Sequence, residues 1–346
     1  MKILVTGATG FLGRRTVARL APHHELRLLL RPTADRSGFP EGVELAAGDV
    51  TDRASLERAA SGVDAILHAA ALVKIDAPAA DFDRVNLGGL DNVLAVASAA
   101  GTRKVVYVSS FIALGPTEKG TAGSADGRSV TGELDETSPI SDRPWINDYE
   151  RTKALADRKA RAAIEGGAPL SVVYPGVIYG PGVLTEGNIV VRHLLDVAHG
   201  RLPALLGRPE RRWNYVFVED VAAGIEAVLE RAPSGARGSR YVLGGENVTQ
   251  ARFYELLAEL GRIQVPKARM PDAVAKMAGA AMKAWARFRK EVPRLTPDLV
   301  EIYRHDWAYD SSRARRELGY SPRTFAAGLG ETLAWLRARG DWPQTR

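Results

Sequence analysis

The chain begins with a glycine-rich turn between a short apolar run and an amphipathic stretch. The turn ends in Thr6-Gly7-Ala8-Thr9-Gly10-Phe11-Leu12-Gly13; the apolar run is Ile3 to Val5, and the amphipathic stretch begins at Phe11. A buried strand, a glycine turn and a helix with unpaired N–H groups at its start form a site for the phosphates of a dinucleotide. Because the spacing G-x-x-G-x-x-G differs from the commoner G-x-G-x-x-G, the flanking elements carry much of this prediction.

Composition limits the classes of protein that fit. With 346 residues, 45% of them hydrophobic, the chain is long enough for one large α/β domain and a smaller one. It has no cysteine, which excludes disulfides, thiolate metal ligands and cysteine nucleophiles, and no metal site is predicted. Without a signal peptide or a long apolar run, we expect a soluble cytoplasmic protein with no stable membrane insertion. The net charge of +6 is scattered, so nucleic acid is not an expected partner.

Strand-like and helix-like segments alternate through the first half, which predicts βαβ units and a Rossmann-type, doubly wound parallel sheet. The expected strands are Ile3 to Val5, Leu26 to Leu30, Val43 to Ala46, Ala65 to Leu67, Val105 to Val108 and Leu170 to Tyr174; the expected helices are Leu12 to Ala21, Ala54 to Ala60, Phe82 to Ala100 and Tyr149 to about Glu165. Residues 1–180, with part of 210–245, form the expected dinucleotide-binding domain. Residues 181–346 form mainly a smaller, helical substrate cap.

The segment from Pro116 to Pro144 interrupts this alternation. It is polar, rich in glycine and without hydrophobic periodicity. A loop of this length is usually functional, and we expect a flap beside the substrate; a plain surface insertion is the alternative.

Residues suited to acid–base chemistry follow the predicted nucleotide site. Ser109 and Ser110 close the strand that ends at Val108, and Tyr149 is followed four residues later by Lys153. Positions four apart share a helix face, so a phenol and an ammonium converge. A cation beside a phenol stabilises the phenolate and is expected to lower the phenol pKa toward the working range.

These features together resemble an extended short-chain dehydrogenase/reductase of the NAD-dependent epimerase/dehydratase superfamily. The similarity runs nearly end to end and covers Thr6 to Gly13, Gly48 to Asp52, His68 to Ala70, Asn86 to Gly89, Val108 to Ser110, Tyr149 to Lys153, Pro175 to Pro181 and Tyr309 to Pro322.

The resemblance implies a role for each matching residue. Cofactor binding is implied for Gly7, Gly10, Phe11 and Leu12 along the pyrophosphate, Asp49 and Val50 at the adenine, Ala69 and Ala70 beside the cofactor, and Tyr149, Lys153, Pro175 and Val177. Ser110, Tyr149 and Lys153 are the implied catalytic residues, with Ser109 as the alternative serine. Asp49 has a second interpretation as a turn residue that caps the following helix, which Asp52 could do instead. Asn86 either assists a water relay or binds backbone.

Arg31 distinguishes between the two nicotinamide dinucleotides. It ends the second predicted strand, where an acidic residue would bind the ribose 2′-hydroxyl of NAD. A guanidinium instead suits a 2′-phosphate, so NADP(H) is the expected cofactor; Arg36 or Arg14 could assist, and a solvated surface arginine is the alternative.

The substrate is less constrained. Residues 271–290 interleave large apolar side chains with Lys and Arg, and they either pack on the cap, line an apolar pocket, or contact a membrane surface or a partner. With Pro293 to Pro297, this region is similar to the dihydroflavonol-reductase-like and 3β-hydroxysteroid-dehydrogenase-like branch, which implies a bulky, mostly apolar ketone or secondary alcohol. Tyr174 departs from the arginine common before Pro-Gly in the family.

Three functions remain open. The first is an NADP-dependent reductase or dehydrogenase, the second a nucleotide-sugar epimerase or dehydratase, and the third a dinucleotide-binding protein without catalysis, which the intact Ser110, Tyr149 and Lys153 argue against. The resemblance also implies a homodimer through Phe82 to Ala100 and Tyr149 to Glu165.

Overall fold

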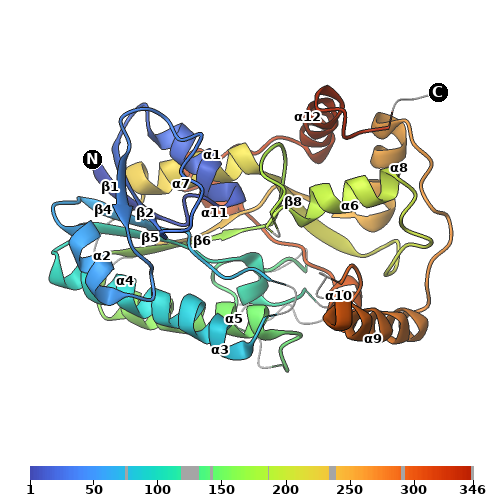
Figure 1. Cartoon of the computed structure of the whole chain (residues 1–346), viewed down its shortest axis with the longest axis horizontal. Helices are drawn as coiled ribbons and strands as arrows, with labels where there is room; N and C mark the ends of the chain where they lie inside the picture. Colours follow the sequence, from blue (N-terminus) through green and yellow to red (C-terminus); the bar gives the residue numbers. More distant parts are fainter. Residues whose placement is uncertain are drawn as a thin grey trace.

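A seven-stranded parallel sheet with helices on both faces forms the centre of the computed structural model (Figure 1). The structure describes residues 1–74, 77–117, 132–140, 143–185, 187–233, 239–289 and 293–343. The strand order is β3-β2-β1-β4-β5-β6-β9. The strands are β1 (Lys2–Thr6), β2 (Glu25–Leu30), β3 (Glu44–Ala47), β4 (Ala65–His68), β5 (Lys104–Val108), β6 (Leu170–Pro175) and β9 (Arg240–Leu243). This order reverses beside β1, so the Rossmann-type fold is confirmed.

Two apolar cores cover the two faces of this sheet. Ile3 and Val5 belong to one core and Leu4 to the other, as expected when successive side chains of a strand point to opposite faces. Figure 1 shows α1, α7 and α11 on one face and α2 to α5 on the other. Their bounds are α1 (Phe11–Leu20), α2 (Arg53–Ala60), α3 (Ala79–Phe82), α4 (Gly88–Ala99), α5 (Asp148–Glu165), α7 (Val218–Arg231) and α11 (Ser312–Leu318).

A smaller part extends from the carboxyl edge of the large sheet. It contains a three-stranded sheet of order β10-β8-β7 and several helices. Its elements are β7 (Val177–Tyr179), β8 (Arg212–Phe217), β10 (Glu246–Thr249), α6 (Ile189–Ala198), α8 (Gln250–Gly261), α9 (Asp272–Arg289), α10 (Pro297–Tyr303) and α12 (Phe325–Ala338). Rings of Tyr215, Phe253 and Phe325 meet with centroids 5.0–5.3 Å apart and join this sheet to α8 and α12.

The expected helix from Phe82 to Ala100 is interrupted. After α3 the backbone makes a π-helical turn over Asp83–Leu87 (η1), and regular helix resumes at Gly88 as α4. Such turns occur often at functional sites, and this one carries Asn86. The expected flap falls largely on residues 118–131 and 141–142, which lie outside the described residues.

The large apolar side chains of α9 do not pack on the cap. The helix contacts α10 instead through small residues: Ala275 and Ala286 are buried, and a Cβ on Gly279 would lie 2.9 Å from the backbone of Thr296. Its large apolar residues are exposed. In the part of the chain that the structure describes, no helix is both long and apolar enough to cross a bilayer.

Candidate active site

Each glycine of the N-terminal turn has a different structural role. Gly7 has φ of 78°, and a Cβ there would lie 2.5 Å from the backbone nitrogen of Ala70, so glycine allows β1 to pass beside the end of β4. A Cβ on Gly13 would lie 2.1 Å from the carbonyl oxygen of Gly7, so α1 packs directly on the turn. Gly10 is the N-cap of α1 and has no side-chain cap. The nearest atom to a Cβ on Gly10 is 3.3 Å away, which leaves its outer side open for a pyrophosphate.

The other predicted cofactor residues lie at the same edge of the sheet. Because the strands are parallel, their carboxyl ends meet there. Phe11 and Leu12 open α1, Arg31 follows β2, Asp49 and Val50 follow β3, Ala69 and Ala70 follow β4, Pro175 ends β6 and Val177 begins β7. The edge therefore presents a backbone cradle that fits a nicotinamide dinucleotide.

Asp49 already holds a turn. Its Oδ1 accepts hydrogen bonds from the backbone N–H and the hydroxyl of Thr51, both at 2.8 Å. Asp52 is the N-cap of α2 and accepts from the N–H of Ala54 at 3.1 Å. Asp49 therefore holds a local turn, but Asp52 caps the helix, so the alternative that Asp49 is the helix cap is wrong. The contact of Asp49 with the adenine stays a prediction.

The three arginines near the end of β2 differ in what they bind. Arg31 and Arg36 are exposed. Arg14 is committed to the loop after β2: it binds the Asp35 carboxylate at 2.8 Å and donates to the carbonyl of Ser37 at 2.7 Å. Arg14 is therefore a support for this loop, and Arg31 is better placed to meet a ligand.

Lys153 is buried at the end of β5. Its Nζ donates to the carbonyl of Val108 at 3.1 Å and to the hydroxyl of Tyr107 at 3.4 Å, and it lies 5.1 Å from the centre of the Tyr107 ring. Burial lowers the pKa of Lys153 to about 7. These contacts hold the Lys153 face of α5 against the end of β5, which Ser110 follows closely in sequence.

Tyr149 lies one turn earlier on α5, with its side chain near that of Ser110. Burial raises the pKa of Tyr149 to about 12, and the interaction with the Ser110 side chain opposes this rise. The expected lowering of the phenol pKa is therefore not found in this structure, because burial of the phenol is the largest effect. Ser109 is buried, and its N–H donates to the carbonyl of Val173 at 2.9 Å. The structure thus brings Ser110, Tyr149 and Lys153 together.

The catalytic helix is fixed at its start. Asn147 accepts from the N–H of Glu150 at 2.9 Å, and Glu150 in return accepts from the N–H of Ile146 at 2.6 Å. Such reciprocal capping satisfies the unpaired N–H groups of a first helical turn. Glu150 is buried and also binds Arg143.

The same helix is fixed again two turns later. The hydroxyl of Tyr174 donates to Oδ1 of Asp157 at 2.5 Å, and the other Asp157 oxygen binds Arg161 at 2.7 Å. Tyr174, which replaces the arginine common in similar sequences, therefore ties β6 to α5.

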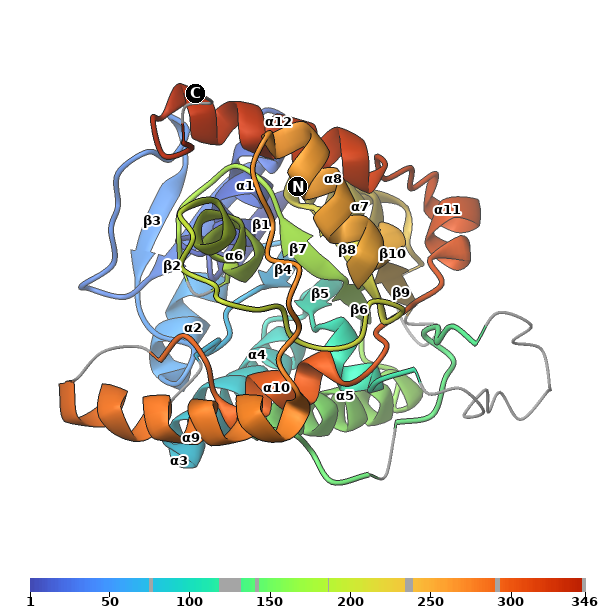
Figure 2. The same ribbon diagram turned by 90° about the vertical axis from the view of Figure 1, so that its right-hand side faces the viewer.

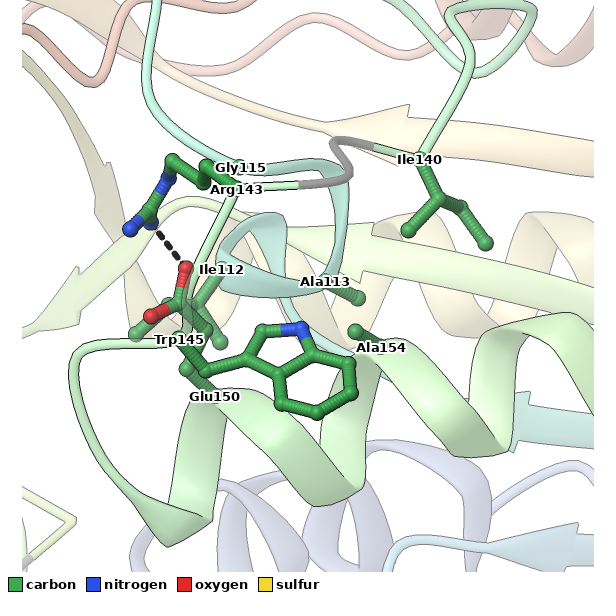
Figure 3. Close-up of a pocket in the computed structure, with 8 residues that line it drawn as sticks. All are labelled: Ile112, Ala113, Gly115, Ile140, Arg143, Trp145, Glu150 and Ala154. Atoms are coloured by element: carbon green, nitrogen blue, oxygen red, sulfur yellow. Dashed lines mark hydrogen bonds and ion pairs between the residues drawn. The ribbon is translucent and has the colours of Figure 1, made fainter.

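A small pocket lies beside the catalytic residues (Figure 3). It is lined by Ile112, Ala113, Gly115, Ile140, Arg143, Trp145, Glu150 and Ala154. The figure shows Trp145 near Ala154 and the Arg143–Glu150 ion pair along one wall. Glu150 directly follows Tyr149, and Ala154 directly follows Lys153. Because adjacent positions of a helix do not share a face, the pocket lies on a different face of α5 from Tyr149 and Lys153.

Sequence reasoning missed two aromatic neighbours of Lys153. His68 and Tyr107 stack with ring centroids 5.6 Å apart, and His68 Nδ1 lies 2.8 Å from the hydroxyl of Thr6. Burial and the nearby Lys153 lower the pKa of His68 to about 3, so this ring is neutral. Both residues sit in fully buried strands, and a sequence pattern gives no signal for them.

Asn86 binds backbone. Its amide oxygen accepts from the N–H of Leu72 at 2.7 Å, and its amide nitrogen donates to the carbonyl of Leu72 at 3.3 Å and to the hydroxyl of Thr152 at 3.1 Å. Of the two interpretations of Asn86, the structure shows the backbone one, with an added link to α5.

Comparisons with known proteins show which family the chain is similar to. The model of the NAD dependent epimerase/dehydratase family matches residues 3–244. A sterol demethylase protein B from Methylococcus capsulatus is 33% identical, covering 98% of this chain and 99% of that protein. A 3 beta-hydroxysteroid dehydrogenase/Delta 5→4-isomerase from Mycobacterium tuberculosis is 30% identical, covering 93% and 86%. The crystal structure of gox2253 superposes with a TM-score of 0.78 at 31% identity, covering 99% of each chain.

Proposed function

The chain belongs to the NAD-dependent epimerase/dehydratase family, and we propose that it is an NADP(H)-dependent oxidoreductase that interconverts a bulky, apolar ketone and its secondary alcohol. The observation that carries this proposal is the convergence of Ser110, Tyr149 and Lys153 at the edge where the glycine turn opens. A nicotinamide dinucleotide held at this edge would supply the hydride for such a reaction.

The chain's own residues account for the proton. The pKa of about 12 keeps Tyr149 protonated at neutral pH, so its hydroxyl can donate to the oxygen of a ketone that accepts a hydride at carbon. Ser110, whose side chain lies near Tyr149, is placed to hold the same oxygen. Lys153 would bind the nicotinamide ribose. In reduction, the C=O double bond becomes C–OH, with the proton coming from Tyr149.

Arg31 supports NADP(H) over NAD(H). It is exposed at the end of β2, where a 2′-phosphate would lie, whereas the nearby Asp35 carboxylate is engaged by Arg14 and by Ser37. The negative charge that would oppose a phosphate is therefore paired.

The relatives support an apolar substrate. Their printed names concern a sterol and a 3β-hydroxysteroid, which are large, mostly apolar molecules with an oxygen on a ring carbon. A nucleotide-sugar epimerase or dehydratase is the second candidate, because the matched family is named for these reactions. It predicts a cofactor that stays bound through purification and no net consumption of NADPH.

The proposal is tested with Tyr149→Phe. Loss of a general acid costs about 10²- to 10⁴-fold in turnover, so reduction of a steroid ketone by NADPH should fall by that factor, while NADPH binding is retained. Tyr241→Phe is the matched control, since that buried tyrosine binds Glu317 away from the site. Normal turnover by Tyr149→Phe would refute the assignment.

A further inference from the structure

An apolar stripe runs along the outer side of α9. Val274, Met277, Ala281, Trp285 and Phe288 follow one another at spacings of three and four residues, which places them on one helix face. The large members are exposed: 52% for Val274, 74% for Met277, 58% for Trp285 and 81% for Phe288. Large apolar side chains gathered in this way mark an interaction surface.

The helix inverts the usual arrangement of a surface helix. An ordinary amphipathic helix turns its large apolar residues toward its own core. Here Ala275, Gly279 and Ala286 form the face that packs on α10, and the bulky residues face away from it. Figure 2 shows the C-terminal half of α9 reaching past the rest of the molecule, so Trp285 and Phe288 lie on its projecting end.

The segment that carries this stripe is rich in positive charge. Residues 267–304 contain nine Lys and Arg and four Asp and Glu, a net of +5 in a chain whose total is +6. Arg289 lies over the ring of Trp285 at 5.1 Å, and Lys276 binds Glu301 at 2.6 Å on the inner side. A second copy docked through this surface would bring like charges together, whereas an anionic surface would be attracted.

We propose that α9 docks this protein on an anionic lipid bilayer. The helix lies in the interface plane, with the stripe from Val274 to Phe288 among the outer acyl segments and the Lys and Arg side chains at the phosphate headgroups. Aromatic residues such as Trp285 favour this depth, because one end of the indole is apolar and the other is polar. The attachment is peripheral and does not depend on the proposed reaction.

The test is co-sedimentation of the full chain with phosphatidylcholine vesicles, with and without phosphatidylglycerol. The wild type should bind the anionic vesicles and release as salt rises, because the attraction is screened. The double variant Trp285→Ser/Phe288→Ser should lose more than about tenfold in partitioning. Leu45→Thr is the matched control, since Leu45 is 43% exposed on the edge strand β3 and away from α9.

Further measurements distinguish this proposal from its alternatives. Light scattering reports the oligomeric state, and a wild-type dimer that the double variant dissociates would show that a second copy covers the stripe and overturn the proposal. Equal vesicle binding by wild type and double variant, or no binding by either, would also overturn it. NADPH-dependent turnover of a water-soluble ketone should be unchanged in the double variant, which separates this inference from the proposed reaction.

Discussion

Replacing Arg31 with Ala should weaken NADPH binding and leave NADH binding nearly unchanged. A hydrogen bond to a charged partner contributes about 1.5–3 kcal/mol, and the exposure of Arg31 places its contribution near the lower end of this range. At about 1.4 kcal/mol for each factor of ten, NADPH should bind about tenfold more weakly. Arg14 cannot compensate, because Asp35 and the carbonyl of Ser37 hold its guanidinium.

The assay is a titration of nicotinamide fluorescence with NADPH and NADH at fixed ionic strength. Arg53→Ala is the matched control: it removes one exposed charge on α2, where Arg53 pairs with Glu57. Arg31→Ala/Arg36→Ala should lower the NADPH preference further, since Arg36 is the other exposed arginine of this segment. An NADPH-to-NADH affinity ratio that Arg31→Ala leaves unchanged, or changes only as much as Arg53→Ala does, would refute the assignment of Arg31 to the 2′-phosphate.

Other substitutions test the turn and a buried carboxyl group. Gly13→Ala should destabilise the fold in thermal unfolding, because its Cβ would lie 2.1 Å from the Gly7 carbonyl oxygen, whereas Gly10→Ala should fold normally and lose nucleotide affinity in the same titration. Burial raises the pKa of Glu136 to about 7 from a usual 4.5, while the N–H of Val242 donates to its side chain at 3.2 Å. The unfolded chain therefore ionises first at this position as pH rises, so the contribution of Glu136 to stability is fully present below pH 4.5 and is lost up to about pH 7. Glu136→Gln should remove this dependence, worth up to about 3 kcal/mol in denaturant unfolding at pH 8; the same pH slope in the variant would contradict it.

Periodicity was sufficient to predict six of the seven strands of the large sheet, all except β9. Runs such as Ile3 to Val5 and Val105 to Val108 are continuous and apolar because both faces of a parallel sheet are covered. Ser110, Tyr149 and Lys153 were also predictable, since their spacing carries the chemistry. The π-helical turn at Asp83–Leu87 was not, because it depends on where Asn86 finds partners in Leu72 and Thr152 rather than on local composition.

Neither the direction of the Tyr149 pKa shift nor the orientation of α9 could be predicted from the sequence, and the reason is the same for both. Both depend on how much solvent a side chain loses, and that is set by elements distant in sequence. Adjacency of Tyr149 and Lys153 suggests an electrostatic effect, but burial of the phenol dominates. Amphipathicity of α9 indicates that one face is buried, but not that Gly279 and its small neighbours supply the packed face.

Helix α5, which carries Tyr149 and Lys153, is fixed to its surroundings at several points. Asn147 and Glu150 cap α5 at its start, and Tyr174 holds it two turns later through Asp157. Lys153 binds the carbonyl of Val108 between these two points, so the proton donor and the strand end move as one unit. A donor held in this way loses little entropy on meeting a carbonyl oxygen, which favours a fixed chemistry.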